Sequence, residues 1–190
     1  MAKTATKKRC SWVPVGHELY ERYHDHEWGR AVRDDRTFFE VLVLESAQAG
    51  LSWETILKRR EGYRQAFAGF DPEKIARFRS RDVARLMQDT GIIRNRLKIE
   101  STITGAEVFL SIQKEFGSFS KYVWSFVNNK TQYSPRGKAR ITSPESDALA
   151  ADLKRRGFKF FGPVIAYAFM QATGLIDDHA PDCFRYRSQR

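Results

Sequence analysis

Apolar residues recur at helical spacing along most of the chain, and several of these stretches begin behind a residue that caps helices. Behind Asp34, apolar side chains at positions 38, 39, 41, 42 and 44 form one stripe that ends at Gly50, a pattern typical of an amphipathic helix. Segments 71–73 and 143–145 each combine a capping residue, a proline and a glutamate. This combination indicates a helix start, and the second helix is expected to stop at Gly157.

Further stretches carry similar signals. Residues 163–173 are apolar on nearly every side and precede Gly174, so this helix is expected at the centre of the core. Alternating strand patterns are nearly absent. The sequence therefore predicts an all-α fold of about seven to nine helices, with 129–143 as its one long polar connection. The other expected helices begin behind Ser52 and from Ser80, or lie within 95–116 (one helix or two) and 118–127.

Composition fits a globular nucleic-acid-binding protein. The 190 residues are 42% hydrophobic, enough for one domain or for two small lobes that share a core. Lysine and arginine exceed aspartate and glutamate by 33 to 23, a net charge of +10, which favours nucleic acid over an anionic membrane as partner. A merely soluble basic protein is the alternative. We expect residues 1–9 to be a disordered basic tail and 10–190 a single cytoplasmic domain, because no apolar signal segment follows the tail and no apolar run could cross a bilayer.

Two cysteines stand near opposite ends of the sequence, each with a histidine at a spacing suited to a metal. His179 and Cys183 form an H-x3-C pair, and Cys10 is followed by His24. Such a Cys2His2 set would make a closed, structural zinc site that ties the N-terminal segment to the C-terminal one. The competitors for the third ligand are His17 and His26. Two buried free thiols are an alternative, and a disulfide is a weaker one in a reducing cytosol.

A candidate phosphate-binding turn lies near 82–100. One helix is expected to end near Gln88, Gly91 makes a turn, and the next helix begins near three cations at 94, 96 and 98. This order resembles a helix–hairpin–helix, whose turn amides and following helix N-terminus bind a DNA phosphate without reading the base. An ordinary turn with Gly91 as a helix cap is the alternative.

A candidate base pocket combines one carboxylate with several rings. Glu45 interrupts a strongly apolar stretch, where a carboxylate is costly unless it is paired or used; a glutamate turned to solvent is the alternative. Core packing is the usual role of aromatic residues, yet rings beside a buried carboxylate also form a slot for a flat, cationic ligand. The rings in question are Trp12, Tyr20, Tyr23, Trp28 and Trp53.

Motifs of other chemistries are absent from the sequence. There is no Walker A loop and no G-x-G-x-x-G, so neither a nucleoside triphosphate nor NAD is expected as a ligand. No G-x-S-x-G elbow occurs either, which argues against a serine hydrolase.

Six short strings, taken together, carry a family resemblance. They are RCSW at 9–12, YHDHEWG at 23–29, QAGLSW at 48–53, QDTGIIR at 88–94, VWSFVN at 123–128 and KRRGFKF at 154–160. Their order resembles the bacterial 3-methyladenine DNA glycosylase I family, within the helix–hairpin–helix superfamily, from Arg9 to about Cys183. No single string is specific, but their co-occurrence is.

The resemblance implies a fold and a set of site residues. The fold would be all-α, with two helical lobes and one structural zinc that joins the N- and C-terminal segments. By position, the catalytic acid of the base pocket falls on Glu45. The zinc ligands fall on Cys10, His24, His179 and Cys183. The base-binding aromatic residues fall on Tyr20, Tyr23, Trp53, Trp12 and Trp28. The DNA-binding residues fall on Gly91, Ile92, Ile93 and Arg94, with Leu51 as a wedge in the base stack.

Two departures from the family pattern stand out. Ser46 and Ala47 occupy positions where a glycine and a glutamine would be expected, which bears on fine substrate preference. The superfamily's usual catalytic aspartate has no counterpart, since no Asp occurs between Asp89 and Asp147.

The implied activity is monofunctional base excision from alkylated double-stranded DNA. The damaged nucleotide would be flipped out, the N-glycosidic bond of 3-methyladenine hydrolysed, and the free base released without a lyase step. The negative charge of Glu45 would favour the cationic alkylated base over neutral adenine. A glycosylase for another alkylpurine, such as 7-methylguanine, and a non-catalytic helix–hairpin–helix DNA-binding module are the alternatives. The protein is expected to act as a monomer with no membrane partner.

Overall fold

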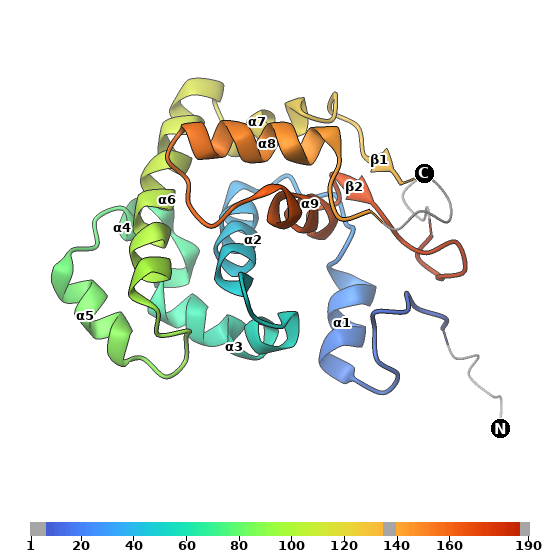
Figure 1. Cartoon of the computed structure of the whole chain (residues 1–190), viewed down its shortest axis with the longest axis horizontal. Coiled ribbons are helices and arrows are strands. Elements are labelled where there is room, and N and C mark those ends of the chain that lie inside the picture. The colour runs from blue at the N-terminus through green and yellow to red at the C-terminus, as the bar shows by residue number, and fades with distance from the viewer. Residues whose placement is uncertain (1–6, 135–139, 187–190) are drawn as a thin grey trace.

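The computed structural model describes residues 7–134 and 140–186, and these are almost entirely helical (Figure 1). Two short strands, β1 (Gln132–Tyr133) and β2 (Ile176–Asp177), are the only sheet within them. The helices are α1 (Glu18–His26), α2 (Asp35–Gln48), α3 (Trp53–Ala66), α4 (Pro72–Ile75), α5 (Ser80–Gln88), α6 (Arg96–Phe116), α7 (Phe119–Ser125), α8 (Pro144–Arg155) and α9 (Pro163–Ala172), with a 3-10 turn at Ala68–Phe70. The prediction of a mainly α-helical fold is confirmed.

Most predicted helix starts are confirmed by the capping bonds that the structure shows. The side chain of Asp34 accepts the Thr37 N–H, Ser52 accepts the Thr55 N–H, and Ser143 accepts the Ser146 N–H. Residues 95–116 form one long helix, not two.

The predicted start at Ser80 is confirmed, since Ser80 is the first residue of α5 behind the N-cap Arg79. Helix α1 was not predicted, because its cap is a ring nitrogen: His17 Nδ1 accepts the Tyr20 N–H at 3.4 Å.

Helices α2 and α9 form the centre of the molecule. Helix α2 contacts α3, α6, α7 and α9, and α9 packs on α8 as well as on α2. Phe38, Phe39 and Leu42 on α2 have no exposed surface, and neither have Phe169 and Met170 on α9. The predicted central position of the apolar 163–173 stretch is therefore confirmed. One apolar cluster runs through α2 to α9, so the helices on either side of α2 share a core.

The two ends of the described chain lie side by side. A smaller apolar cluster joins Cys10 and Tyr23 to Cys183. The Phe184 N–H donates to the Lys8 carbonyl at 2.9 Å, and Lys8 Nζ lies 2.7 Å from Asp182 Oδ2. Of the expected basic tail, residues 1–6 lie outside the described residues, as do 135–139 of the polar connection. None of the helices described is long and apolar enough to cross a membrane.

Candidate active site

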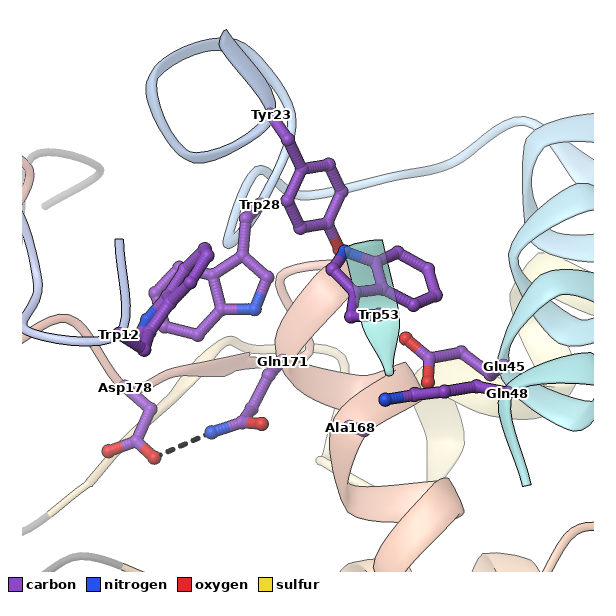
Figure 2. Close-up of a pocket in the computed structure, with 9 residues that line it drawn as sticks. All are labelled: Trp12, Tyr23, Trp28, Glu45, Gln48, Trp53, Ala168, Gln171 and Asp178. Carbon is purple, nitrogen blue, oxygen red and sulfur yellow. Dashed lines mark hydrogen bonds between the residues drawn. The ribbon is translucent and has the colours of Figure 1, made fainter. Parts of the chain in front are cut away.

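A cavity of about 240 Å³ opens between the N-terminal segment and helices α2, α3 and α9 (Figure 2). Five of its lining residues are aromatic or carboxylate residues that the sequence singled out. Residues far apart in the chain meet here, so the cavity exists only in the folded protein. The lining residues are Trp12, Tyr23, Trp28, Glu45, Gln48, Trp53, Ala168, Gln171 and Asp178.

Glu45 is the buried acid of this cavity. Its side chain extends from α2 toward the Trp53 ring, next to the Gln48 amide (Figure 2). The residue is only 3% exposed, and its Oε2 has no hydrogen-bond partner among the described residues. Burial raises the pKa of Glu45 to about 8. A buried, unpartnered carboxylate is unfavourable, and a hydrogen-bond donor or a cation placed in the cavity would relieve that cost.

Two pairs of rings wall the cavity. Tyr23 on α1 and Trp53 at the start of α3 form one pair, with ring centroids 5.4 Å apart. Trp12 and Trp28 form the other pair, in edge contact at 5.1 Å. The Trp53 Nε1 is buried and has no partner among the described residues. The slot between the pairs is therefore lined by aromatic faces, which suit a flat ligand.

Tyr20 does not line the cavity. Its ring contacts Trp12 at 6.0 Å and His17 at 4.9 Å. It therefore lies one ring behind the wall. Its spacing from Tyr23 on α1 gave no way to separate the two tyrosines by sequence.

Three polar lining residues were missed by the sequence analysis. Gln48 lies one turn after Glu45 on α2. Gln171 lies on α9, and its Nε2 donates to Asp178 Oδ2 at 2.7 Å. The signal for Gln171 was present, because it is the one amide in the otherwise apolar stretch 163–172. Asp178 stood next to His179 and drew no attention of its own.

The turn between α5 and α6 is docked directly on α3. A Cβ on Gly62 of α3 would lie 2.3 Å from the Gly91 carbonyl oxygen, so two glycines allow the backbones to touch. Ile92 is buried, and the Ile93 N–H donates to the Tyr63 hydroxyl at 3.3 Å. Gly91 is not the cap of α5, because Asp89 holds that position and Gly91 lies outside the left-handed region. Close approach, not helix capping, explains this glycine.

Lys98 serves the neighbouring helix. The sequence grouped it with the cations of the turn, but its Nζ donates to the carbonyls of Ala47 and Ala49 at 2.8 and 2.7 Å. These carbonyls end α2 and lack intrahelical donors, so a cation satisfies them. Desolvation lowers the pKa of Lys98. Leu51, 39% exposed, follows on the same α2–α3 turn, so the turn that carries it is tied to the start of α6.

A second cluster of polar residues lies behind the Trp28 wall. The ligand atoms of Cys10, His24 and Cys183 lie within 4.8 Å of one another, and all three residues are buried. The His179 ring lies 5.3 Å from that of His24, and its Nε2 is buried without a partner among the described residues. Trp28 packs on the His179 ring at 4.6 Å, so the cluster supports one wall of the cavity.

Two aspartates orient the histidines of this cluster. Asp25 bonds His24 Nδ1 and Asp177 bonds His179 Nδ1, each at 2.9 Å, which leaves both Nε2 atoms available as ligands. His24 Nε2 lies 3.3 Å from Cys183 Sγ. Although burial opposes it, hydrogen bonds from Arg9 and His24 lower the pKa of Asp25 to about 2. Hydrogen bonds from Cys10 and from His24 hold the pKa of Cys183 well below its ordinary value. Thiolate and neutral imidazole donors held by carboxylates are the ligands of structural zinc.

The two other histidines lie elsewhere. His17 Nε2 is 3.1 Å from Glu54 Oε1, and His26 lines a separate cavity beside Arg30 and Arg60. Neither belongs to the cysteine cluster, in agreement with the choice made by resemblance.

Comparison with known proteins identifies the family. The profile of the methyladenine glycosylase family matches residues 12–186. The chain belongs to this family. It is 47% identical over 182 residues to DNA-3-methyladenine glycosylase 1 of Escherichia coli K12, covering 94% of this chain and 97% of that protein.

Solved structures of the same family superpose closely. A crystal structure of 3-methyladenine DNA glycosylase I shares 48% identity with a TM-score of 0.89, covering 93% of this chain and 98% of that one. A variant of 3-methyladenine DNA glycosylase I, solved in complex with 3-methyladenine, shares 40% identity with a TM-score of 0.89, covering 94% and 97%. The matched range includes every residue that lines the cavity.

Proposed function

We propose that this protein is a DNA-3-methyladenine glycosylase of base excision repair. It hydrolyses the N-glycosidic bond of 3-methyladenine in alkylated double-stranded DNA and releases the free base. The observation that carries this proposal is the unpartnered, buried carboxyl of Glu45 in a cavity walled by rings. The name of the Escherichia coli relative and the 3-methyladenine bound to a related variant support it.

The site suits a cationic purine. Alkylation at N3 places a positive charge on adenine, which weakens the glycosidic bond and makes the base a good leaving group. Trp53 and Tyr23 stack the extruded base, a contact worth about 1–3 kcal/mol per base. Glu45 accepts hydrogen bonds from the adenine edge, and its negative charge favours the alkylated base over neutral adenine.

Binding and ionisation of Glu45 are linked. Its pKa of about 8 in the empty cavity keeps the carboxyl mostly protonated at neutral pH. A cationic base stabilises the carboxylate, so the proton leaves as the alkylated base binds. Neutral adenine gives no such stabilisation, and the cavity therefore discriminates by charge as well as by shape.

The chemistry of the site is hydrolytic. Water attacks the sugar carbon as the base departs, and the carboxylate stabilises the departing base. A lyase step needs a lysine amine, and the described residues that line the cavity include no lysine. We therefore propose a monofunctional enzyme. We also propose that it acts as a monomer in the cytoplasm, where bacterial DNA lies.

The α5–α6 turn would hold the DNA as a helix–hairpin–helix. Gly91 to Arg94 lie on a turn whose backbone is fixed against α3, and Arg94 is exposed. Phosphate bound at such a turn fixes the register of the duplex without reading sequence. Leu51, exposed on the neighbouring turn, would fill the gap left by the flipped nucleotide.

The cysteine cluster would hold one structural zinc ion. The orphaned Nε2 of His179 and the converging atoms of Cys10, His24 and Cys183 fit a tetrahedral set. The four protein ligands leave no position for a substrate, so the ion would stabilise the fold and take no part in hydrolysis.

The released-base profile tests the function directly. The protein is incubated with methylated duplex DNA, and free bases are separated by chromatography. We expect 3-methyladenine to dominate. A profile led by 7-methylguanine assigns the protein to another alkylpurine, and no released base at all leaves only a DNA-binding module.

The variant Glu45→Gln then tests the acid. It removes the charge but keeps the shape, and excision should fall about 100-fold, as it does when one transition-state contact is lost. Glu61→Gln on the surface of α3 is the matched control and should excise at the wild-type rate. Undiminished release by Glu45→Gln would falsify the role given to Glu45.

A further inference from the structure

The connection between α8 and α9 is clamped at both ends by buried rings. Phe158 and Phe161 are buried and meet edge to face with centroids 5.6 Å apart. Phe161 also contacts Phe169 of α9 at 5.6 Å. Phe158 packs where Gly105 of α6 leaves room, since a Cβ there would lie 2.8 Å from the Phe158 ring. The segment between the two rings is therefore held in place.

The two residues between these rings are presented outward. Phe160 has a φ of +55°, in the left-handed region, and its side chain is 38% exposed. This backbone conformation suits glycine and is unfavourable for an aromatic residue. Burial of the ring does not compensate for it. A strained, outward-facing aromatic residue on an anchored segment is typical of a binding position.

This segment lies beside α2, which carries Glu45, and beside α6, which follows the α5–α6 turn. Phe158 and Lys159 share a crevice with Phe39, Val43 and Ser46 of α2 and with Ser101 and Thr102 of α6. Ser46 is the neighbour of Glu45. Ser101 is five residues into α6, about 8 Å along the axis from the helix start. In Figure 1 the connection runs across the molecule between α6 and α9. Ser46, Ser101 and Thr102 also line a crevice that holds Ile93 of the α5–α6 turn. The segment and the turn therefore flank the same part of α2 and α6.

The segment also carries uncompensated positive charge. Arg155 and Arg156 pair with Asp152. Lys154 and Lys159 are exposed, and within 7–134 and 140–186 neither has an ion-pair partner. The unpaired Lys159, which precedes the exposed Phe160 in the chain, matches a polyanion whose bases and sugars offer apolar faces, which is the chemistry of DNA.

We propose that Lys159 and Phe160 form a second DNA-contacting element, with the lysine ammonium on a phosphate and the phenyl ring against the sugar–base surface of the duplex beside the extruded nucleotide. The proposal rests on the proposed function and names the contacts that hold the DNA on the side of the cavity away from α1. It explains why an aromatic residue occupies a position whose backbone favours glycine.

The variant Phe160→Gly separates binding from folding. Glycine relieves the backbone strain, so the melting temperature should stay level or rise, whereas a merely structural ring would lower it on removal. The probe is a duplex oligonucleotide with a tetrahydrofuran abasic-site analogue, and its affinity should fall about tenfold. Phe160→Asn, which also tolerates the left-handed region, should give the same pattern.

The variant Lys159→Ala tests the phosphate contact. Affinity should fall for damaged and undamaged duplexes alike, and the slope of log affinity against log salt should shrink by about one. Lys114→Ala, an exposed lysine in the last turn of α6, is the matched control and should change neither quantity.

The outcomes distinguish this proposal from the function on which it rests. If wild-type protein releases no base from methylated DNA, the proposed function fails. If it releases base and Phe160→Gly and Lys159→Ala bind the abasic duplex with wild-type affinity and salt slope, the second element is wrong. A drop in melting temperature for both Phe160 variants, with unchanged affinity, also overturns it by assigning the ring to the fold.

Discussion

Two polar clusters lie on either side of the Trp28 ring, and they are built in opposite ways. In the cysteine cluster, each histidine has an aspartate behind it, and three ligand atoms already converge. In the cavity, Glu45 Oε2 has no hydrogen-bond partner within the part of the chain that the structure describes, and burial raises the pKa of Glu45 to about 8. The arrangement of the first cluster suits a permanently bound ligand. The unsatisfied acid of the second suits a ligand that binds and is released.

The two regions therefore differ in what they contribute to the free energies of folding and of ligand binding. A permanent ion makes its binding free energy part of the folding free energy. When a ligand binds only transiently, the ligand-free protein carries the free-energy cost of a buried, unpaired acid. A ligand that supplies the missing positive charge removes this cost, and the free energy released adds to its affinity. The predictions that follow break one region at a time.

The largest expected effect comes from the cysteine cluster. Cys183→Ala should abolish binding of the proposed zinc ion and remove much of the apparent folding free energy that such an ion supplies, on the order of 10 kcal/mol for a structural zinc. Zinc content by atomic absorption and the melting temperature should fall together. Because Trp28 packs on His179, affinity for free 3-methyladenine should weaken as well. Zinc content equal to that of the wild type would remove Cys183 from the ligand set.

The next effect concerns the cavity acid and has a defined sign with pH. The folded-state pKa of Glu45, about 8, lies above its ordinary value of 4.5. Its contribution to stability is therefore full below pH 4.5 and is lost as the pH rises through about 8. Glu45→Gln cannot ionise, so it should melt at a higher temperature than the wild type at pH 9 and close to it at pH 4.5.

The same ionisation predicts the activity profile. Since the free enzyme must give up the Glu45 proton, kcat/KM for excision should rise with pH through about 8 in the wild type. Glu61→Gln is the control and should show the wild-type pH profile of kcat/KM and the wild-type pH dependence of the melting temperature. Equal pH dependence of melting in the wild type and Glu45→Gln would place the Glu45 carboxyl in solvent.

The smallest effect concerns Lys98, which ties together the two turns that we propose to contact DNA. Lys98→Met removes the donors for the Ala47 and Ala49 carbonyls and should cost about 2 kcal/mol of unfolding free energy in a urea titration. The α2–α3 turn should loosen, so abasic-duplex affinity should fall a few-fold while free 3-methyladenine still binds. Arg96→Met, at the exposed start of α6, is a control for lost charge. If both variants weaken DNA binding equally with no loss of stability, Lys98 acts only by its charge.

Local signals predicted most of the helices and half of the cavity. Capping residues such as Ser52 and Ser143 bond to residues of their own helix, so they can be recognised from the local sequence. Glu45 was visible because a carboxylate in an apolar run is unusual. Helix α1 was missed since its cap is a histidine ring, a group that caps helices rarely.

What the sequence left open depends on contacts between distant segments. Tyr20 and Tyr23 are equivalent in the sequence, and only the packing of Trp12 places one of them behind the other. Gly91 has the sequence pattern of a cap but owes its place to Gly62. Lys98 has the pattern of a phosphate ligand, yet it donates hydrogen bonds to the carbonyls at the end of α2. In the last two cases the contacting residue lies far away in the sequence.

The meeting of the chain's two ends has a consequence during synthesis. Trp12 and Asp178 face the same cavity, and Cys10 is completed by Cys183. A ribosome that has made nine-tenths of the protein has therefore made neither a finished cavity nor a finished cysteine cluster. A premature stop or a proteolytic cut before residue 178 removes Asp178 from the cavity and Cys183 from the cysteine cluster together.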